Sequence, residues 1–254
     1  MRRFVPDREV HLWIVRLEAS EGPFEQLSTW LSPDETARAA RFRFDKHRRA
    51  FVLGRAALRA LLGRHLGVPA AQVSFSYGPK GKPALADATH PLRFNASNSG
   101  NLAAIAITEG CEIGVDIEQR RPVPEIERIA ERFFAPQEAA ELMALPEALR
   151  TQGFFNCWTR KEAYIKAVGD GLSVPLDGFR VTLRPGAAAQ LLDLGGSREA
   201  ARGWTMHDFF PEPGYAGAVA YPDQPRRLVI RPVLAAGDIV ANGPVAKAGQ
   251  KTLI

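Results

Sequence analysis

The chain has 254 residues, of which 46% are hydrophobic and 24% charged, and its formal net charge is +5 at pH 7. This length and composition fit a soluble globular protein of one large domain or of two domains of roughly 125 residues each. No apolar run approaches the roughly 18 residues of a membrane span, the first residues lack a signal peptide's apolar core, and Cys111 and Cys157 are too few for a disulfide scaffold. We therefore expect a cytoplasmic protein that does not enter a membrane.

The first part of the chain alternates predicted strands and helices. Apolar residues predict a strand at about 10–17, and a helical region that starts with Leu31-Ser-Pro-Asp-Glu35 follows it. A second helix is expected at about 47–65, then a β-rich segment at 73–77 and a strand of small residues at 102–108, which suits burial on both faces. The apolar residues of the second helix recur at helical spacing and are predicted to form core: Phe51, Leu58, Leu61 and Leu62.

Basic residues are concentrated in and just before the second predicted helix. From Arg38 to Arg64 the sequence has nine Lys or Arg residues against a single acidic one, Asp45. Such a cluster attracts phosphate, whether on a small ligand or on a nucleic-acid backbone, although a solvated helix face would look the same. Because no recognition helix, zinc finger or aromatic RNA-binding motif accompanies the cluster, we do not expect a nucleic-acid partner.

Two polar loops follow this helix. The segment Tyr77–Pro83 combines Gly and Pro turn formers with Lys82, so it could bind phosphate through backbone amides and an ammonium group, or be an ordinary surface hairpin. The run Phe94–Gly100 precedes a buried strand and could either cap an element or contact a ligand through Ser97 and Asn98.

The second part of the sequence repeats the first in the same order. The matched pairs are Glu9–Val15 with Glu112–Glu118, Leu31–Glu35 with Phe134–Glu138, Leu66–Pro69 with Leu172–Pro175, and Ser99–Ala106 with Pro213–Ala220. We therefore predict an α+β fold of two pseudo-symmetric halves that arose by internal duplication, with a ligand cleft between them. The predicted halves are residues 1–110 and 111–232, and residues 233–254, which lack periodicity, are expected to form a flexible tail.

The halves differ in their first strand. Period-two alternation places Asp116 and Glu118 on one face of the predicted strand, where the aligned first half has Trp13 and Val15. Asp is a poor strand former, so its presence favours a function over folding, although an edge strand with a polar face is the alternative.

A helix predicted at about 152–168 brings a third carboxylate. Its residues Trp158, Glu162 and Lys166 recur at every fourth position and share one stripe, and Trp158 is expected to anchor the core. Combined with Asp116 and Glu118, Glu162 makes a plausible Mg²⁺ site, because Mg²⁺ prefers oxygen ligands and leaves positions for phosphate oxygens. Lys161 and Lys166 flank Glu162 and could offset charge on a leaving phosphate, or be helix-surface lysines.

These segments together resemble the 4′-phosphopantetheinyl transferases, specifically the larger surfactin-synthetase-activating (Sfp-like) type. The likeness runs from about residue 9 to residue 222. Four blocks carry it: Leu31–Glu35 through Arg59; Gly81–Pro83 with Phe94–Gly100; Gly114–Glu118; and Trp158–Lys166 with Gly171–Leu176.

The resemblance implies a monomeric, Mg²⁺-dependent enzyme with coenzyme A bound between two similar halves. It would transfer the phosphopantetheine arm of coenzyme A to a serine of an apo acyl or peptidyl carrier protein of fatty-acid, polyketide or nonribosomal-peptide synthesis, and release adenosine 3′,5′-bisphosphate. The implied metal ligands are Asp116, Glu118 and Glu162; the implied catalytic residues are Glu162, Lys166 and Glu138; the implied coenzyme A contacts are Arg48, Arg49, Arg55, Lys82, Ser97, Asn98, Lys161 and Lys166.

Two positions depart from the family pattern. Asn98 stands where the family usually has a histidine, and asparagine can donate a hydrogen bond but never carries the imidazolium charge. Glu35 stands where at least one member has a lysine, which leaves Arg38 as the nearby cation. Both departures bear on coenzyme A affinity.

Two other functions compete with the transferase. A non-catalytic protein that binds coenzyme A or a nucleotide on the same scaffold is one, with Asn98 as its support, and a nucleic-acid-binding protein is the other. The three carboxylates and Lys166 favour the enzyme, since a binding protein does not need them. An acidic carrier protein would meet the arginines that follow the metal strand, unless these form a solvated helix face. They are Arg120, Arg121, Arg128 and Arg132.

Overall fold

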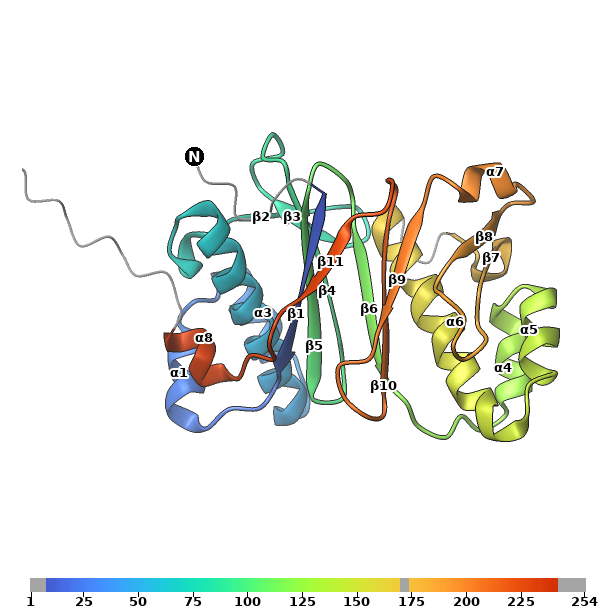
Figure 1. Cartoon of the computed structure of the whole chain (residues 1–254). Coiled ribbons are helices and arrows are strands. Elements are labelled where there is room, and N and C mark those ends of the chain that lie inside the picture. Colours follow the sequence, from blue (N-terminus) through green and yellow to red (C-terminus); the bar gives the residue numbers. More distant parts are fainter. Residues whose placement is uncertain (1–7, 170–173, 242–254) are drawn as a thin grey trace, which may run out of the picture.

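The computed structural model describes residues 8–169 and 174–241 and has the predicted mixture of helices and strands. Strands occupy the middle of the molecule and helices lie on both sides (Figure 1). Two predicted features lie outside the described residues, at least in part. They are residues 171–173 of the Gly171–Leu176 motif and residues 242–254 of the expected tail.

The first half contains the predicted strands and helices in the predicted order, but the prediction of a loop at Phe94–Gly100 is wrong, because most of it lies in a strand. The elements are β1 (Glu9–Arg16), α1 (Glu21–Ser28), α2 (Pro33–Ala40), α3 (Asp45–Leu66), a 3₁₀ turn (Ala70–Gln72), β2 (Phe75–Tyr77), β3 (Pro83–Leu85), β4 (Leu92–Ser99) and β5 (Leu102–Glu109). The helix α2 begins with Pro33, and its N-terminus is closed by the side chain of Glu35, which accepts a hydrogen bond from the backbone of Ser32. The helix α3 ends at Gly67, whose left-handed backbone stops it.

The second half follows the same order. It contains β6 (Gly114–Gln119), α4 (Ile126–Phe133), α5 (Pro136–Met143), α6 (Glu147–Val168), a 3₁₀ turn (Leu176–Gly178), β7 (Phe179–Val181), β8 (Leu191–Leu194), α7 (Arg198–Ala201), β9 (Thr205–Phe209) and β10 (Tyr215–Tyr221). The helices α3 and α6 both have 22 residues, and α2 and α5 both begin with proline. This repeated order is compatible with an internal duplication, which stays a prediction.

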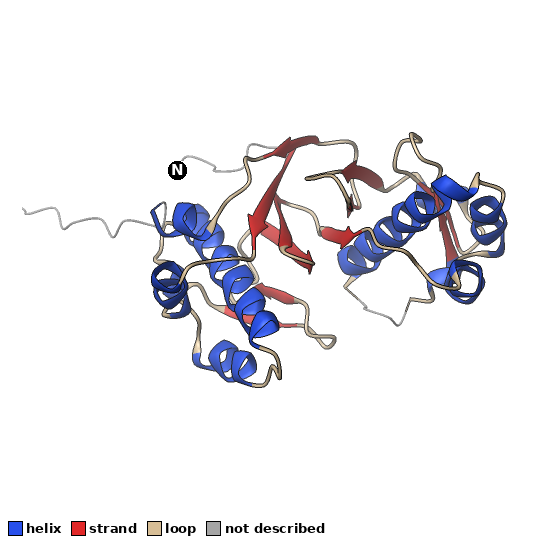
Figure 2. Cartoon of the chain, turned by 90° about the horizontal axis from the view of Figure 1, so that it is seen from below, coloured by secondary structure: helices blue, strands red, loops and turns tan. Residues whose placement is uncertain are grey.

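Two sheets pack against each other at the centre. One has the strand order β11-β1-β5-β4 and the other β6-β10-β9. Their facing sides form one apolar cluster, to which β1 contributes Val10 and Leu12 and β6 contributes Val115 and Ile117, each 0% exposed. The helices α3 and α6 lie on the outer sides, as Figure 2 shows from below. The layers are therefore helix, sheet, sheet and helix.

The chain returns to the first half after completing the second. The strand β11 (Arg227–Ile230) pairs in parallel with β1, and α8 (Ala236–Ala241) buries Ala236 and Ile239 in the core of the first half. The prediction that the second half extends to residue 232 and that a free tail starts at 233 is therefore wrong for residues 227–241. The pairing of β11 links residues far apart in sequence, and no local pattern marks it.

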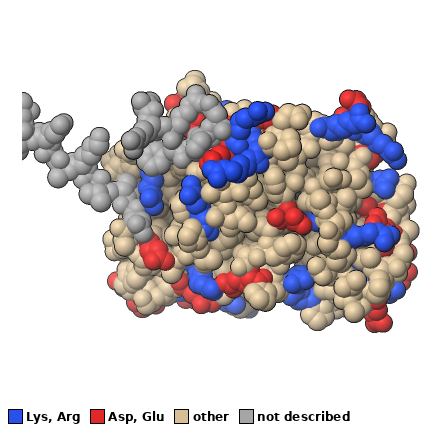
Figure 3. Space-filling view, in the orientation of Figure 1, with Lys and Arg blue, Asp and Glu red and all other residues tan. Residues whose placement is uncertain are grey.

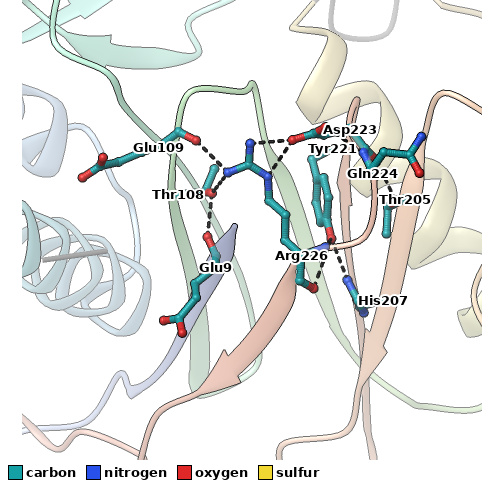
Figure 4. Close-up of polar contacts among 9 residues, drawn as sticks. All are labelled: Glu9, Thr108, Glu109, Thr205, His207, Tyr221, Asp223, Gln224 and Arg226. Carbon is teal, nitrogen blue, oxygen red and sulfur yellow. Dashed lines mark hydrogen bonds and ion pairs between the residues drawn. The ribbon is translucent and has the colours of Figure 1, made fainter. Parts of the chain in front are cut away.

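Arg226, just before β11, secures this return at the junction of the halves (Figure 4). Its guanidinium donates two hydrogen bonds to one carboxylate oxygen of Asp223, at 2.9 and 2.6 Å. It also donates to the Thr108 hydroxyl at 3.1 Å and to the Glu109 carbonyl at 2.7 Å, at the end of β5. The turn after β10 is thereby tied to the segment that leads from the first half to the second.

The surface carries both signs of charge. On the face shown in Figure 3, basic and acidic side chains are interspersed over both halves. None of the helices in the described ranges is long and apolar enough to cross a membrane.

Candidate active site

The helix α6 lies directly on β6 because the strand begins with a glycine. A Cβ atom added at Gly114 would stand 2.0 Å from the carbonyl oxygen of Ala163 and 2.4 Å from the nitrogen of Ala167, so no other residue fits without moving the helix. This contact brings the polar stripe of α6 over the outer face of β6. Asp116 and Lys166 thereby come into direct contact.

A compact polar network joins the two elements to β4. The ammonium of Lys166 donates to Asp116 Oδ1 at 2.6 Å and to the Ser97 hydroxyl at 2.9 Å, and Ser97 in turn donates to the same Asp116 oxygen at 2.9 Å. Asp116 is only 3% exposed. Its other oxygen, Oδ2, is buried and has no hydrogen-bond partner among the described residues. A buried carboxylate oxygen without a partner is costly, and this one is suited to accept a cation.

The pKa values of three carboxyls in the network are raised. Burial raises the pKa of Asp116, against the opposing effect of Lys166. Burial also raises the pKa of Glu118 and of Glu162, and the charge of Asp116 raises both further. A positive ion would offset both the burial of Asp116 and the charge that Asp116 places on its two neighbours.

The carboxylates of Asp116, Glu118 and Glu162 are the kind of ligand that a hard divalent cation binds, although their side chains do not converge on one point. Within residues 8–169 and 174–241, no group of three or more His, Cys, Asp or Glu side chains is placed to hold a metal ion. Lys166 instead pairs with the Oδ1 atom of Asp116, and the Oδ2 atom has no hydrogen-bond partner among the described residues. Carboxylate oxygens are what Mg²⁺ binds, so Asp116, Glu118 and Glu162 remain the predicted ligands.

Two adjoining pockets run from this network to the first half. One, of about 270 Å³, is lined by Glu162 and Lys166 of α6 and by the hairpin loop around Lys80. The other, of about 230 Å³, lies between α3 and the sheet. The pockets share three residues: Gly81, Pro83 and Ala96. Together they form a cleft to which both halves contribute, as the sequence predicted.

The second pocket is lined by basic and polar groups. Arg38 and Arg55 reach it from α2 and α3, and Ser97 and Asn98 from β4. Arg55 lies 3.4 Å from Glu35 through its Nε atom, whereas its Nη1 atom is buried and without a hydrogen-bond partner among the described residues. A guanidinium with an unused donor in a pocket is suited to an anionic ligand.

Comparison with known proteins identifies the family. Residues 16–110 match the family model described as 4′-phosphopantetheinyl transferase, N-terminal, and residues 112–220 match that of the 4′-phosphopantetheinyl transferase superfamily. The chain belongs to the 4′-phosphopantetheinyl transferase superfamily.

Relatives agree over most of the chain. The 4′-phosphopantetheinyl transferase HetI of Nostoc sp. is 42% identical over 214 residues, which cover 84% of this chain and 87% of that protein. The 4′-phosphopantetheinyl transferase Sfp of Bacillus subtilis is 31% identical over 208 residues, 81% of this chain and 89% of that protein. A partial structural likeness, with a TM-score of 0.33 and 20% identity over 46% of this chain and 99% of the other, is to an ACPS–CoA complex of Chronobacterium ammoniagenes. The family match and the two sequence relatives show that the chain is a transferase.

Two residues predicted as catalytic or phosphate-binding belong to the core of this transferase instead. Lys161 and Glu138 are 0% and 1% exposed and form an ion pair of 2.7 Å. Lys161 also donates to the carbonyls of Leu176 and Phe179, and Glu138 accepts from the backbone of Val181. With every polar atom engaged in the interior, neither side chain reaches the cleft, and the prediction of a phosphate contact by Lys161 is wrong in this structure.

The first half has a matching buried pair, which explains one departure from the family pattern. Glu35 and Arg59 are 1% and 2% exposed and meet at 2.6 Å, and Arg59 also donates to the carbonyl of Val73. Glu35 and Glu138 occupy the same place at the start of α2 and α5. Glu35 therefore holds the first half together as well as standing near Arg55.

Arg48 and Arg49 do not reach the cleft. Arg48 pairs with Asp45 on the same helix at 2.5 Å, and Arg49 donates to Glu21 and to the carbonyl of Ala19. Both guanidinium groups lie over the ring of Phe24 on α1. Of the three arginines predicted to bind phosphate, only Arg55 lines a pocket of the cleft.

Lys82 lies at the cleft but is engaged. Its ammonium donates to Glu112 at 2.9 Å, to the carbonyl of Ile113 at 3.4 Å and to the carbonyl of Ala167 at 3.2 Å. It thus ties the β2–β3 hairpin to the C-terminal end of α6, where a cation is favoured. Its predicted contact with coenzyme A is untested.

Two residues of the site were not singled out from the sequence. Asn95 accepts a hydrogen bond from the backbone of Val115 at 3.0 Å, and Ser99 donates to Glu118 at 2.6 Å. The signal was present in β4, since Asn95, Ser97 and Ser99 alternate and must share one face of a strand.

Proposed function

We propose that this transferase moves the 4′-phosphopantetheine arm of coenzyme A to a serine of an apo acyl or peptidyl carrier protein, with Mg²⁺ as its cofactor, and releases adenosine 3′,5′-bisphosphate. The observation that best supports this proposal is the buried Oδ2 atom of Asp116, which has no hydrogen-bond partner among the described residues. Two further carboxylates and Lys166 lie next to it, at the mouth of the cleft. A protein that only bound coenzyme A would have no need of this costly arrangement. The non-catalytic alternative is therefore not favoured.

The proposed donor lies along both pockets. Arg55, Arg38, Ser97 and Asn98 would hold the nucleotide end, and Lys166 would contact the pyrophosphate at the α6 end. The ammonium of Lys166 already reaches across to Ser97 on β4. A small rotation of its flexible side chain would therefore be enough to bring it to the pyrophosphate. Asn98 is exposed and lines the pocket, and it would donate a neutral hydrogen bond where a histidine could carry charge.

The proposed reaction is an in-line displacement at phosphorus. The carrier's serine oxygen attacks the β-phosphorus of coenzyme A, a new O–P bond forms, and the bond to the adenosine bisphosphate breaks. Glu162 would take the serine proton, directly or through a water. Asp116, Glu118 and Glu162 would hold the Mg²⁺, which supplies charge neutralisation on the pyrophosphate.

The partner surface is proposed to adjoin β6. Arg120 and Arg121 follow the metal strand and Arg128 and Arg132 lie on α4, where they could meet an acidic carrier. We propose that the protein acts as a monomer, since one chain supplies both sides of the cleft, and in the cytoplasm, where its free cysteines would stay reduced.

Replacement of Glu162 tests this function. We expect Glu162→Ala to lower the rate of transfer by about 100-fold or more, the scale of losing a group that acts on the reacting atoms. Mass spectrometry of several apo carrier proteins incubated with coenzyme A and Mg²⁺ would measure the gain of one phosphopantetheine and identify the client.

The matched control is Glu141→Ala. Glu141 lies in the same half on α5, pairs with Arg184 and lines neither pocket of the cleft, so its loss should leave the rate unchanged. Transfer by Glu162→Ala at a near wild-type rate would refute the role of Glu162. Absence of transfer by the wild type to every carrier class would refute the function.

A further inference from the structure

The strand β4 reaches across to β6 with alternate side chains, although the two strands belong to different sheets. Asn95 Oδ1 accepts from the backbone nitrogen of Val115, Ser97 donates to Asp116 and Ser99 donates to Glu118. Because these three residues share one face of β4, they form a row of side-chain hydrogen bonds where a continuous sheet would have backbone ones. Both strand-borne metal ligands thus receive a hydroxyl from the opposite half.

The hydroxyl of Ser99 has a defined direction. Its oxygen accepts a hydrogen bond from the backbone nitrogen of Gln119 at 3.1 Å, and its proton goes to Glu118 Oε2 at 2.6 Å. A hydroxyl has one proton, so the acceptor and donor roles are both assigned. A bond of this length to an ionised carboxylate is of the strong, charge-assisted kind.

Ser99 is itself held in place by the turn that follows. Gly100 has a φ of +59°, and a Cβ atom there would stand 2.4 Å from the hydroxyl of Tyr215 and 2.6 Å from Gln119 Oε1. The Tyr215 hydroxyl accepts from the backbone of Asn101 at 3.2 Å and donates to its side chain at 2.6 Å. The turn between β4 and β5 is thereby fixed to the ends of β6 and β10.

Ser97 and Ser99 differ in their access to a ligand. Ser97 contacts Lys166 and lines the second pocket, so it is part of the binding machinery. Ser99 is not among the residues that line either pocket of the cleft, and its hydrogen bonds go to Glu118 and Gln119. An effect of Ser99 on the reaction would therefore pass through β6, where Ser99 bonds the side chain of Glu118 and the backbone of Gln119.

We propose that Ser99 is a positioning residue that orients the carboxylate of Glu118 to receive the divalent cation. This inference rests on the proposed function, in which Glu118 is a metal ligand. Hydrogen-bonded partners of metal ligands typically contribute 10- to 100-fold to metal affinity. The first half would then contribute to the metal site of the second without touching the metal.

Binding of Mn²⁺ tests the proposal without turnover. The electron paramagnetic resonance signal of free Mn²⁺, titrated with purified protein, gives the dissociation constant. We expect Ser99→Ala to raise this constant about tenfold or more, and Ser99→Thr, which keeps the hydroxyl, to restore it to within about threefold of wild type. The control Ser28→Ala removes a hydroxyl that bonds to the Phe24 carbonyl in α1, and should bind Mn²⁺ as wild type does.

A double-mutant cycle separates positioning from general damage. In a Glu118→Gln background, Ser99→Ala should have no further effect on the dissociation constant, because its route to the metal is already lost. Wild-type affinity in Ser99→Ala, or a full additional loss in the Glu118→Gln background, would overturn the proposal. Failure of the wild type to bind Mn²⁺ would also overturn it, and transfer assays run in parallel would show whether the enzymatic function still stands.

Discussion

The helices α3 and α6 have the same length and the same place in their halves, yet they lie at different distances from their sheets. The backbone of α6 touches β6 at Gly114, and the helix lies directly on β6 and β10. The helix α3 makes few close backbone approaches to β1 or β5, and a pocket opens between its residues Phe51 and Arg55 and the strands β4 and β5. The same helix–sheet arrangement therefore has two outcomes: close packing places Lys166 against Asp116, and wider spacing leaves a pocket beside α3.

Each half has a buried ion pair that ties its long helix to neighbouring elements. We expect the largest effect on stability from breaking this pair. We predict that Lys161→Ala lowers the free energy of unfolding by about 3–5 kcal/mol, because it leaves Glu138 charged and buried without its partner. Arg59→Ala should have a similar effect on the first half through Glu35. Urea denaturation followed by circular dichroism would measure both.

The control for the buried pairs is Arg202→Ala, which breaks an exposed pair with Glu199 and should leave stability within error of wild type. If Lys161→Ala instead kept wild-type stability and weakened only coenzyme A binding, Lys161 would be a ligand contact and the assignment to the core would fail.

A methyl group added at Gly114 tests how closely α6 lies against β6. Gly114→Ala should cost about 2–3 kcal/mol, because the added Cβ collides with the backbone of α6. It should also reduce transfer, since Glu162 and Lys166 move away from Asp116. Thermal and urea unfolding with a parallel transfer assay would measure both effects.

The same substitution on α3 should have the opposite sign. A Cβ atom at Gly54 meets only Leu17 at 3.6 Å, so Gly54→Ala should stabilise the helix by about 0.5–1 kcal/mol. Destabilisation of equal size at both positions would mean that the two helices are equally close to their sheets, contrary to the comparison.

The wider spacing of α3 predicts a ligand contact at Arg55. Arg55→Met should raise the KM for coenzyme A about tenfold, equivalent to about 1.4 kcal/mol, with kcat little changed. Steady-state kinetics with a carrier protein would measure it. Arg48→Met should leave KM unchanged, because Arg48 pairs with Asp45, lies over Phe24 of α1 and does not line the pocket. Equal effects of the two substitutions would argue for nonspecific attraction by the basic cluster.

The smallest expected effect is a gain in stability at the cost of activity. The pKa of Glu162 is raised, so the folded protein binds its proton more tightly than the unfolded chain, and ionised Glu162 destabilises the metal-free protein at neutral pH. Without Mg²⁺, Glu162→Gln should therefore be more stable than wild type at pH 7, by less than about 1 kcal/mol. This corresponds to a melting temperature about 2 °C higher.

The pH dependence has a definite sign. The advantage of Glu162→Gln should shrink as the pH falls through the raised pKa of Glu162 and vanish where the wild-type carboxyl is protonated in both states. Melting curves in EDTA from pH 7 down to about pH 4 would measure this. A variant less stable than wild type at pH 7, or an advantage that grows on acidification, would contradict a pKa of Glu162 raised by burial and by the charges of Asp116 and Glu118.

Local sequence patterns were enough to predict the strand at Asp116, the helix at Glu162 and the cleft between halves. They were also enough to separate Lys161 from Lys166, because a helix turns by 100° per residue and Lys161 points away from the stripe that Glu162 and Lys166 share. Their positions on either side of Glu162 in the sequence nevertheless suggest a phosphate contact for both lysines, and only Lys166 lies at the site.

Other features depended on pairing between distant residues. The sequence match aligns Ile105 with Val219, whereas the sheets pair Ile105 with Trp13 and Ala218 with Asp116, so the predicted alignment of Trp13 with Asp116 would match Ile105 to Ala218 instead. A slip of one residue reverses the face of a strand. A slip of one residue leaves no trace in the sequence where both strands consist of small apolar residues, because the shifted residues are still alike.

The position of β11 has a consequence for biosynthesis. During translation β1 can pair with β5 as soon as the first half has left the ribosome, but its other edge waits for β11, which is made only after the whole second half. In that interval the nascent chain presents the unpaired backbone of β1, an edge open to mispairing with other chains. A chaperone that covers exposed strand edges would therefore be needed most while residues 110–226 are being made.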